Sequence, residues 1–223
     1  MNIQEVCNFI NFFINKFTGQ FYTIPELIEV IDRGQMSLFE DLQPRYATSQ
    51  RIKDALSPFK ETMPFTTLIS GVVTITDPDY LALGDIQIYY IAAGQRRYAG
   101  IDVVNEDIRA GRLNSQVDPV TTTNPIAEQV GTKSWRLYPA SAYNGDVTYL
   151  RRPVKPVFGY TIISGRVIVY DPNTSTQLEW LEQWHNAVCI KALANIGINI
   201  REGEVSQFAE AKSTANYMGV NML

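Results

Sequence analysis

The sequence predicts an α+β fold, because helical periodicity fills both ends of the chain and strand patterns fill its middle. The strand segments follow one another without helices between them, which favours antiparallel pairing over alternating βαβ units. We therefore expect N-terminal helices, a central mostly antiparallel sheet with hairpins and long loops, and C-terminal helices that pack on the sheet or on a neighbouring subunit. This pattern predicts a helical segment over residues 1–60 and an α+β domain over residues 61–223.

The N-terminal segment predicts three helices. Apolar residues recur at helical spacing through residues 3–17. Thr23 is expected to cap a second helix, with Glu26 three positions later in a capping-box pattern. We expect Gly34 to interrupt this second helix, and a short third helix to follow over residues 49–56. Because polar residues break up the apolar runs near the N-terminus, the sequence predicts neither a secretion signal nor a membrane span.

The middle of the chain is rich in β-branched and aromatic residues, which predicts strands. Residues 66–80 end in an Asp-Pro-Asp turn and residues 85–91 alternate apolar and polar side chains, so together they predict a hairpin. The later strand segments are residues 134–139, residues 146–152, and a hairpin formed by residues 160–163 and 166–170.

Residues 114–134 are polar, rich in threonine and interrupted by proline, and they predict a long loop. A loop of this length is unusual inside a compact domain unless it has a function or reaches a partner. Because the segment offers little apolar surface with which to pack, we expect a neighbouring chain to order it.

The C-terminal part predicts a helix over residues 177–195, capped by Thr176, and a weaker amphipathic helix over residues 204–218. The second half of the first of these helices is apolar almost all round, so we expect it to be covered on both sides, either by its own domain or by a neighbouring subunit. An excess of phenylalanines in the N-terminal helix adds to the case for oligomerisation. The candidate interface residues on the C-terminal helix are Trp180, Trp184, Ile190 and Leu193.

The composition and motifs favour a protein without catalytic activity. The sequence contains no phosphate-binding glycine motif and no cysteine or histidine spacing typical of zinc, so we expect no cofactor and no metal. The one histidine, His185, shares an apolar helix face with Cys189, but such a pair lacks an evident orienting group. Cys7 and Cys189 are expected to be buried free thiols. A weaker alternative is an enzyme with an unrecognised site at His185 and Cys189.

Residues 149–160, "YLRRPVKPVFGY", place the cations Arg151, Arg152 and Lys155 between aromatic residues. One interpretation is a nucleic-acid-binding segment, in which the cations contact phosphates and the aromatic rings stack on bases. The other is a stiff connector, because each proline favours extended geometry and removes a backbone donor. The formal net charge of −4 argues against non-specific nucleic-acid binding, so we favour the connector, with its cations paired to carboxylates of this chain or of a neighbour.

The order of segments in the second half resembles the head-to-tail connector proteins of tailed bacteriophages, especially those of the crAss-like type. The resemblance rests on "VDPVTTTNPIAEQVG", "WRLYP", "VTYLRRPVKP", a hairpin, "LEWLEQWHNAVCIKALANIGINI" and "QFAEAKSTANY". It implies a virion structural protein that is assembled in the host cytoplasm and forms a homo-oligomeric ring, a dodecamer in the family. It further implies contacts with the portal protein and with other ring or tail proteins, DNA passing through the lumen, and no membrane. The alternative function is a nucleic-acid-associated module that uses residues 149–160.

Overall fold

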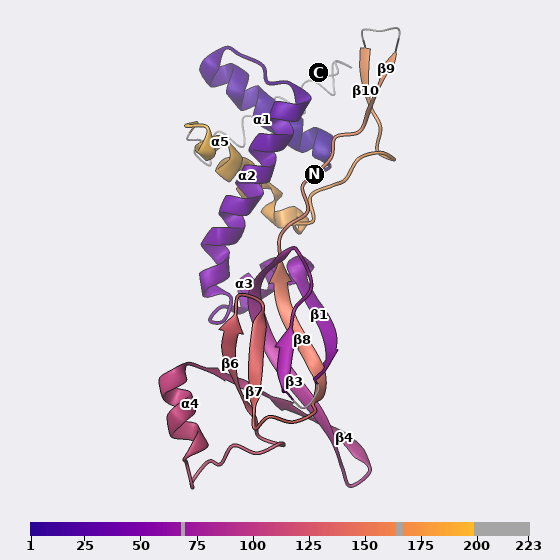
Figure 1. Cartoon of the computed structure of the whole chain (residues 1–223). Coiled ribbons are helices and arrows are strands. Elements are labelled where there is room, and N and C mark those ends of the chain that lie inside the picture. The colour runs from indigo at the N-terminus through magenta and orange to yellow at the C-terminus, as the bar shows by residue number, and fades with distance from the viewer. Residues whose placement is uncertain (68–69, 164–166, 199–223) are drawn as a thin grey trace. The chain divides into compact units, whose positions relative to one another are not determined.

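The computed structural model describes residues 1–67, 70–163 and 167–198, and it has the α+β class that the sequence predicts (Figure 1). The chain divides into two compact units. Residues Met1–Pro58 and the chain from Pro153 onward form the helical unit, and Phe59–Arg152 form the sandwich unit. The predicted boundary at residue 60 lies close to this division. The prediction of one continuous domain over 61–223 is wrong, because the chain returns to the N-terminal helices after Arg152.

The helical unit is built on three longer helices, α1 (Ile3–Thr18), α2 (Ile24–Leu42) and α5 (His185–Asn195). Its shorter elements are η1 (Gln43–Arg45), α3 (Gln50–Ala55), η2 (Ser57–Phe59, whose last residue belongs to the sandwich unit), η3 (Glu182–Trp184), and the strands β9 (Tyr160–Ile163) and β10 (Val167–Tyr170). The predicted helices over residues 3–17 and 49–56 and the hairpin of residues 160–170 are confirmed, although the turn at 164–166 lies outside the described residues. The predicted helix over 204–218 also lies outside them.

Local capping explains where α1 and α2 begin. The Asn2 side chain accepts a hydrogen bond from the Glu5 backbone N–H at 2.9 Å, and the Glu5 carboxylate accepts one from the Asn2 backbone N–H at 3.2 Å. The predicted capping box of α2 is also present, since the Glu26 carboxylate accepts from the backbone N–H of Thr23 at 2.7 Å. The expected interruption at Gly34 is wrong, because α2 runs through this residue to Leu42.

The C-terminal helix is shorter than its periodicity predicts. Residues 177–181 are not helical, and α5 begins only at His185 after the short helix η3. Thr176 does not cap a helix, because its backbone pairs with Val157 in an isolated β-bridge. Helix α5 packs on α1 and α2 rather than on a sheet, which corrects the expected packing of the C-terminal helices. This arrangement explains its apolar circumference without a neighbouring subunit.

The sandwich unit holds two four-stranded sheets in the orders β1-β8-β3-β4 and β2-β7-β6-β5. All strand pairs are antiparallel except β5 with β6. The strands are β1 (Lys60–Thr66), β2 (Val72–Thr74), β3 (Tyr80–Ala92), β4 (Gln95–Gly100), β5 (Asp102–Val104), β6 (Ile126–Gly131), β7 (Ser134–Tyr138) and β8 (Asn144–Arg151), and helix α4 (Glu106–Leu113) follows β5.

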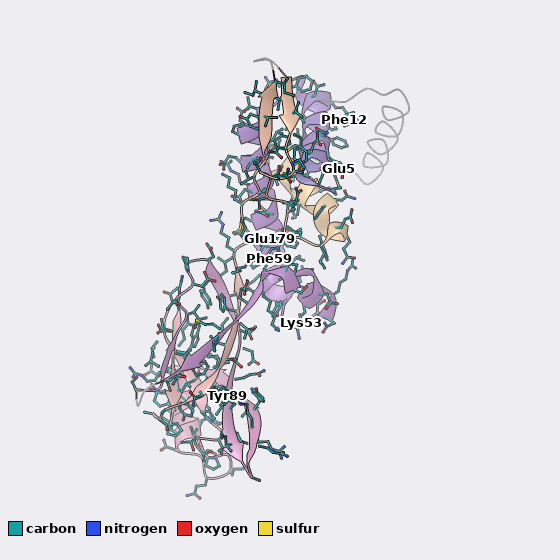
Figure 2. All side chains as sticks on the ribbon, turned by 90° about the vertical axis from the view of Figure 1, so that its right-hand side faces the viewer. Glu5, Phe12, Lys53, Phe59, Tyr89 and Glu179 are labelled. Atoms are coloured by element: carbon teal, nitrogen blue, oxygen red, sulfur yellow. The ribbon has the colours of Figure 1, made fainter. Side chains whose placement is uncertain are left out.

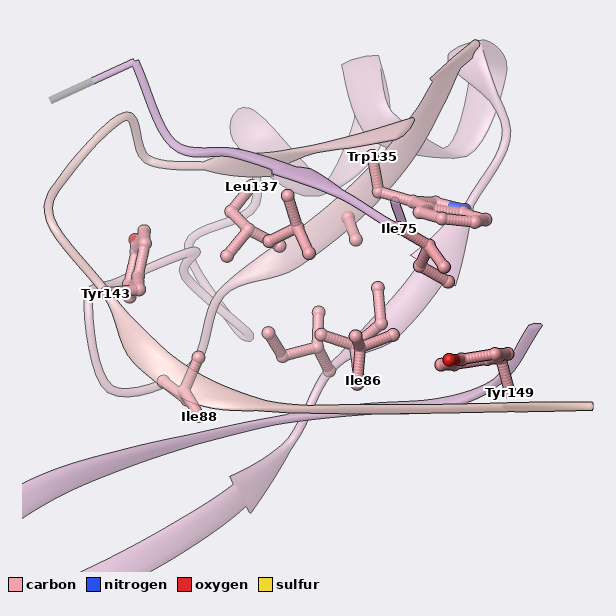
Figure 3. Close-up of a cluster of buried hydrophobic side chains, with 11 residues drawn as sticks. Ile75, Ile86, Ile88, Trp135, Leu137, Tyr143 and Tyr149 are labelled. Atoms are coloured by element: carbon pink, nitrogen blue, oxygen red, sulfur yellow. The ribbon is translucent and has the colours of Figure 1, made fainter. Parts of the chain in front are cut away.

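A single apolar core fills the space between the two sheets (Figure 3). Ile86 and Ile88 of β3 face Trp135 and Leu137 of β7, and each of the four side chains is at most 2% exposed. Alternation along the strands produces this core, because every second side chain of a strand points to the same face. The predicted strands over residues 134–139 and 146–152 are therefore confirmed as β7 and β8.

Two strand-level predictions are wrong. Residues 66–80 and 85–91 do not form a hairpin, because β2 pairs with β7 in one sheet while β3 pairs with β8 and β4 in the other. The predicted loop over 114–134 ends early, since residues 126–131 form β6, whose Ile126 and Ala127 are fully buried. Short apolar strand segments carry no local signal of their partners, so pairing is decided by the packing of the whole unit.

Candidate assembly surfaces

The residues of the connector segment make contacts within their own chain. Strand β8 ends at Arg151, whose Nε lies 3.1 Å from Oε1 of Glu61 on the neighbouring strand β1. Lys155 forms an ion pair with Glu29 of α2. The hydrogen bond from Lys155, followed by the attraction of its charge, lowers the pKa of the Glu29 carboxyl below its ordinary value. These pairs agree with the connector interpretation, in which carboxylates of the chain itself engage the cations.

Backbone contacts fix the path of the same segment. The Arg152 N–H donates to the carbonyl of Asp79 at 2.7 Å. Two residues later, the Val154 N–H donates to the Glu179 carboxylate at 2.8 Å. The carbonyl oxygen of Val154 accepts a hydrogen bond from the side-chain amide of the buried Gln35 at 3.1 Å. Residue 154 is thus held from both sides, as expected for a stiff connector between two regular elements.

The candidate interface residues on the C-terminal helix divide into two groups. Trp180 and Leu193 are 2% and 0% exposed, so they belong to the core of the helical unit and cannot form an exposed interface, which corrects that prediction. Trp184 and Ile190 are partly exposed, and the Arg51 guanidinium lies 5.8 Å from the centre of the Trp184 ring. The sequence could not separate these groups, because the coverage of α5 depends on how α1 and α2 pack.

His185 and Cys189 occupy the interior of the helical unit. The His185 ring is 6% exposed, and its Nε2 lies 2.8 Å from the carbonyl oxygen of Trp180. Burial raises the pKa of the Cys189 thiol to about 12, and it raises that of the Cys7 thiol to about 12 as well. Since the thiolate is the reactive form, these pKa values disfavour nucleophilic chemistry at Cys189.

The ribbon of β9 and β10 exposes apolar side chains and contains none of the interface residues expected from the sequence. Among the described residues the two strands pair only with each other, so no other described strand covers either edge. Ile162 and Ile168 are cross-strand partners on one face and are 59% and 45% exposed. Ile163 and Val169, one residue away from these, point to the opposite face and are 53% and 39% exposed. In the sequence, the consecutive apolar residues of these strands were the available signal that both faces of the ribbon are apolar.

The base of this ribbon is attached to the helical unit. The Phe158 and Tyr170 rings lie 5.2 Å apart between their centres, and the Tyr170 hydroxyl accepts a hydrogen bond from Gln177 at 2.9 Å. The other amide atom of Gln177, Oε1, accepts from the Ile3 N–H at 2.6 Å at the start of α1. The exposed strands are therefore held at one end, and no described residue covers the apolar side chains along their length.

The second surface is the end of the hairpin formed by β3 and β4. Strand β8 accompanies β3 only as far as Tyr89, while β4 continues to pair with β3 up to Ala92. A turn at Ala93 and Gly94, both with positive φ, joins the two strands. The ribbon tip (residues 89–98) thus extends beyond the third strand, and Figure 2 labels Tyr89 at its start.

The third surface is α4, which has no buried residue. Its side chains reach the body of the sandwich unit through Arg109, whose Nη1 lies 2.7 Å from Oε2 of Glu128 and 3.2 Å from the Tyr138 hydroxyl. Arg112 Nη2 lies 2.8 Å from Oδ2 of Asp118, and Oδ1 of the same carboxylate accepts a hydrogen bond from the Asn124 amide at 2.9 Å. These bonds tie the loop to α4 and to itself within the chain, while Val117 stays 96% exposed. The expectation that a neighbouring chain orders this loop stays a prediction.

Three general findings complete the description. None of the described helices is both long and apolar enough to cross a membrane. Within the described residues, no group of three or more histidine, cysteine, aspartate or glutamate side chains is arranged to hold a metal ion. Searches of protein-family models and of curated proteins found no match to this chain.

Proposed function

We propose that this protein is a structural subunit of a tailed-phage virion that forms a homo-oligomeric ring, connects the portal to the tail around the DNA path, and performs no catalysis. The resemblance of its second half to head-to-tail connectors supports the virion role, the contact with portal and neighbouring ring or tail proteins, and the dodecameric state of that family. The observation that carries the proposal is the β9–β10 ribbon, with its apolar side chains exposed on both faces.

The physical argument concerns the stability of such a ribbon. An isolated two-stranded hairpin is at best marginally stable in water, and open strand edges with apolar, uncharged side chains promote pairing with other chains. Here the paired strands carry four exposed aliphatic side chains and no charged residue. A subunit designed to remain monomeric would be expected to protect these edges with lysine, proline or a covering helix. A subunit of an assembly instead covers them with a neighbour.

The nucleic-acid-binding alternative receives less support from the connector segment. Arg151 and Lys155 are paired with Glu61 and Glu29, so phosphates would have to displace carboxylates that are already in place. Pairing within the chain leaves the connector as the simpler role for residues 149–160.

The experiment measures the mass of the full-length chain in solution by light scattering and examines the particles by electron microscopy for rings. Ile162→Lys combined with Ile168→Lys places two charges on one face of the ribbon, and we expect this variant to become monomeric while its melting temperature stays within a few degrees of wild type. The reason is that both side chains are exposed and contribute little to the core.

The control is Leu81→Lys combined with Val130→Lys, two apolar residues of the sandwich unit with similar exposure, 42% and 45%. We expect this control to assemble like wild type. A wild-type chain that remains monomeric at all accessible concentrations would contradict the proposal, as would equal loss of assembly in the ribbon variant and the control.

A further inference from the structure

The ribbon tip of β3 and β4 (residues 89–98), which is distinct from the β9–β10 ribbon, carries positive charge. From Ile86 to Ile101 the chain contains no acidic residue and two arginines, Arg96 and Arg97. The Arg96 guanidinium lies 4.3 Å from the centre of the Tyr89 ring, which holds it in place without neutralising it. No carboxylate forms an ion pair with either arginine among the described residues. The hydrogen bond with Tyr98 is the main cause that raises the pKa of Arg96, and the attraction of Asp146 is the smallest.

The tip is apolar as well as cationic. Ile91 is 79% exposed and Tyr98 is 57% exposed. Ile91 pairs across the strands with Arg96, so the two lie on the same face as the Tyr89–Tyr98 pair. Arginine, tyrosine and a large aliphatic side chain are the residue types that contribute most to buried centres of protein interfaces. A highly exposed isoleucine is better satisfied by a protein surface than by a phosphate backbone.

Helix α4 and the segments beside it form the opposite electrostatic surface. Asp102, Glu106, Asp118 and Glu128 surround Arg109 and Arg112 at 2.7–3.6 Å, and Asp107 adds a further carboxylate in the first turn of the helix. Arg136 on β7, the cross-strand partner of Glu128, adds a third cation, so five carboxylates against three guanidiniums leave an excess of two negative charges. Exposed apolar side chains occur on the same segments, namely Ile108, Leu113 and Val117.

We propose that the ribbon tip of one copy docks on α4 of a second copy of this chain. The two surfaces match in charge, since a positive apolar tip meets a negative surface that also exposes aliphatic side chains. The remainder of the chain is acidic, so a second copy attracts the tip whereas duplex DNA would be repelled by most of the molecule. The contact also gives α4, which buries no residue within its own chain, a surface on which to pack.

The geometry favours a contact between copies rather than within one copy. Figure 1 shows α4 and the end of β4 on opposite sides of the sandwich unit. A contact between two different surfaces is heterologous, and repetition of a heterologous contact produces a ring when the rotation closes. The inference therefore rests on the proposed ring-forming function and names the surfaces that the ring would use in the sandwich unit.

The test is a charge-reversal exchange on the full chain, followed by light scattering at low salt. Arg96→Glu with Arg97→Glu, and separately Glu106→Lys with Asp107→Lys, should each weaken self-association about tenfold or more, because like charges then face each other. An equimolar mixture of the two variants should regain association, since the reversed tip fits the reversed helix and the two unchanged surfaces still fit each other. Wild-type association should also weaken as salt is raised.

The mixture also shows whether the α4 substitutions merely unfold the helix. An unfolded α4 could not bind the tip of the Arg96→Glu, Arg97→Glu variant, so the mixture would then fail to associate. Lys60→Glu with Arg45→Glu, two exposed cations outside the tip, is the control matched in charge change, and we expect it to associate like wild type. Unchanged association of the tip variant, or a mixture that fails to associate, would overturn the contact while leaving ring formation through the β9–β10 ribbon intact. A wild-type chain that never associates would instead remove both.

Discussion

Gly34 of α2 lies directly against Ala192 of α5. A Cβ atom placed on Gly34 would lie 2.6 Å from the Ala192 Cβ and 2.7 Å from its backbone nitrogen. Both distances are shorter than any ordinary contact, so the two helices approach each other through the missing side chain. The glycine that the sequence suggested as a helix break is instead a position at which α2 and α5 come into close contact.

Gly34→Ala should therefore destabilise the protein. Alanine is intrinsically better than glycine inside a helix by about 1 kcal/mol, but overpacking a tight contact costs about 1–3 kcal/mol. The clash involves backbone atoms of α5, which cannot move aside as a flexible side chain could. We expect a net loss in the free energy of unfolding, measured by urea denaturation. An increase in stability would show that the helices can separate at no cost.

Gly111→Ala provides the matched control for this prediction. Gly111 also lies inside a helix, α4, but a Cβ at this position would meet nothing within 4 Å. The substitution should therefore show only the helix propensity, a gain of about 0.5–1 kcal/mol in the stability of the sandwich unit. The two substitutions should change the free energy of unfolding in opposite directions, so their comparison isolates the effect of packing.

The Asp-Pro-Asp turn predicts a specific dependence of stability on pH. Tyr149 donates its hydroxyl to Asp77 at 2.8 Å, and the Asp79 N–H donates to the same carboxylate at 2.8 Å. These two hydrogen bonds lower the pKa of Asp77 below its ordinary value of 3.8. Burial, followed by the bond to Asp77, raises the pKa of Tyr149 to about 12.

A carboxyl group whose pKa is lowered by folding stabilises the fold above its unfolded pKa. That stabilisation is lost as the pH falls through the folded pKa. Asp77→Asn should therefore cost about 1 kcal/mol at pH 7 and progressively less below about pH 3.8. Denaturation curves of both proteins at several pH values test this expectation. A difference that stays constant down to pH 2 would contradict it.

The two thiols should be unreactive in the folded protein. Burial raises the pKa of both Cys7 and Cys189 from 9.0 to about 12, which lowers the thiolate fraction at pH 8 by about a thousandfold. A colourimetric disulfide reagent should therefore label neither residue in buffer and both in denaturant. Rapid labelling of Cys189 without denaturant would revive the enzyme hypothesis that involves His185.

The connector cations should contribute little to nucleic-acid binding. If Arg151, Arg152 and Lys155 contacted phosphates, changing all three to glutamine would flatten the log–log salt dependence of duplex binding by about two to three units. Because Arg151 and Lys155 already pair with Glu61 and Glu29, we expect wild type and the variant to show no salt-dependent binding. A steep wild-type slope that the substitutions flatten would favour the nucleic-acid module.

Strand β6 determines the effect of a deletion in the Thr- and Pro-rich segment. A deletion of residues 118–130 would leave the monomer folded if this segment were only a loop. The deletion would remove most of β6, including the buried Ile126 and Ala127, and would separate β7 from β5 in the second sheet. We expect the deletion to unfold the sandwich unit, which circular dichroism would show. Removal of Val117 alone is the control, and it should leave the unit folded because that side chain is 96% exposed.

The sequence by itself determined the elements whose signals are local. The caps at Asn2 and Thr23, the left-handed Gly19 that ends α1, and the turn at Asp77 each act over a few residues, and such contacts form wherever the rest of the chain lies. Their positions could therefore be inferred without knowing the fold, although the Asn2 cap was not recognised from its pattern. The extended path of the connector was also foreseeable, because proline restricts the backbone locally, whereas its partners Glu61 and Glu29 lie far away in sequence.

Only the tertiary structure decided which strands pair and which apolar residues are covered. Residues 66–80 contain β-branched side chains that suit either sheet, and the choice of partners is made by the common core around Trp135 and Ile86. Likewise, Leu193 and Ile162 are both aliphatic and differ in burial, because α5 packs on α1 and α2 while nothing in the described chain covers Ile162. Hydrophobic burial is non-directional, so an apolar residue specifies that it will be covered and leaves the partner to the packing of distant segments.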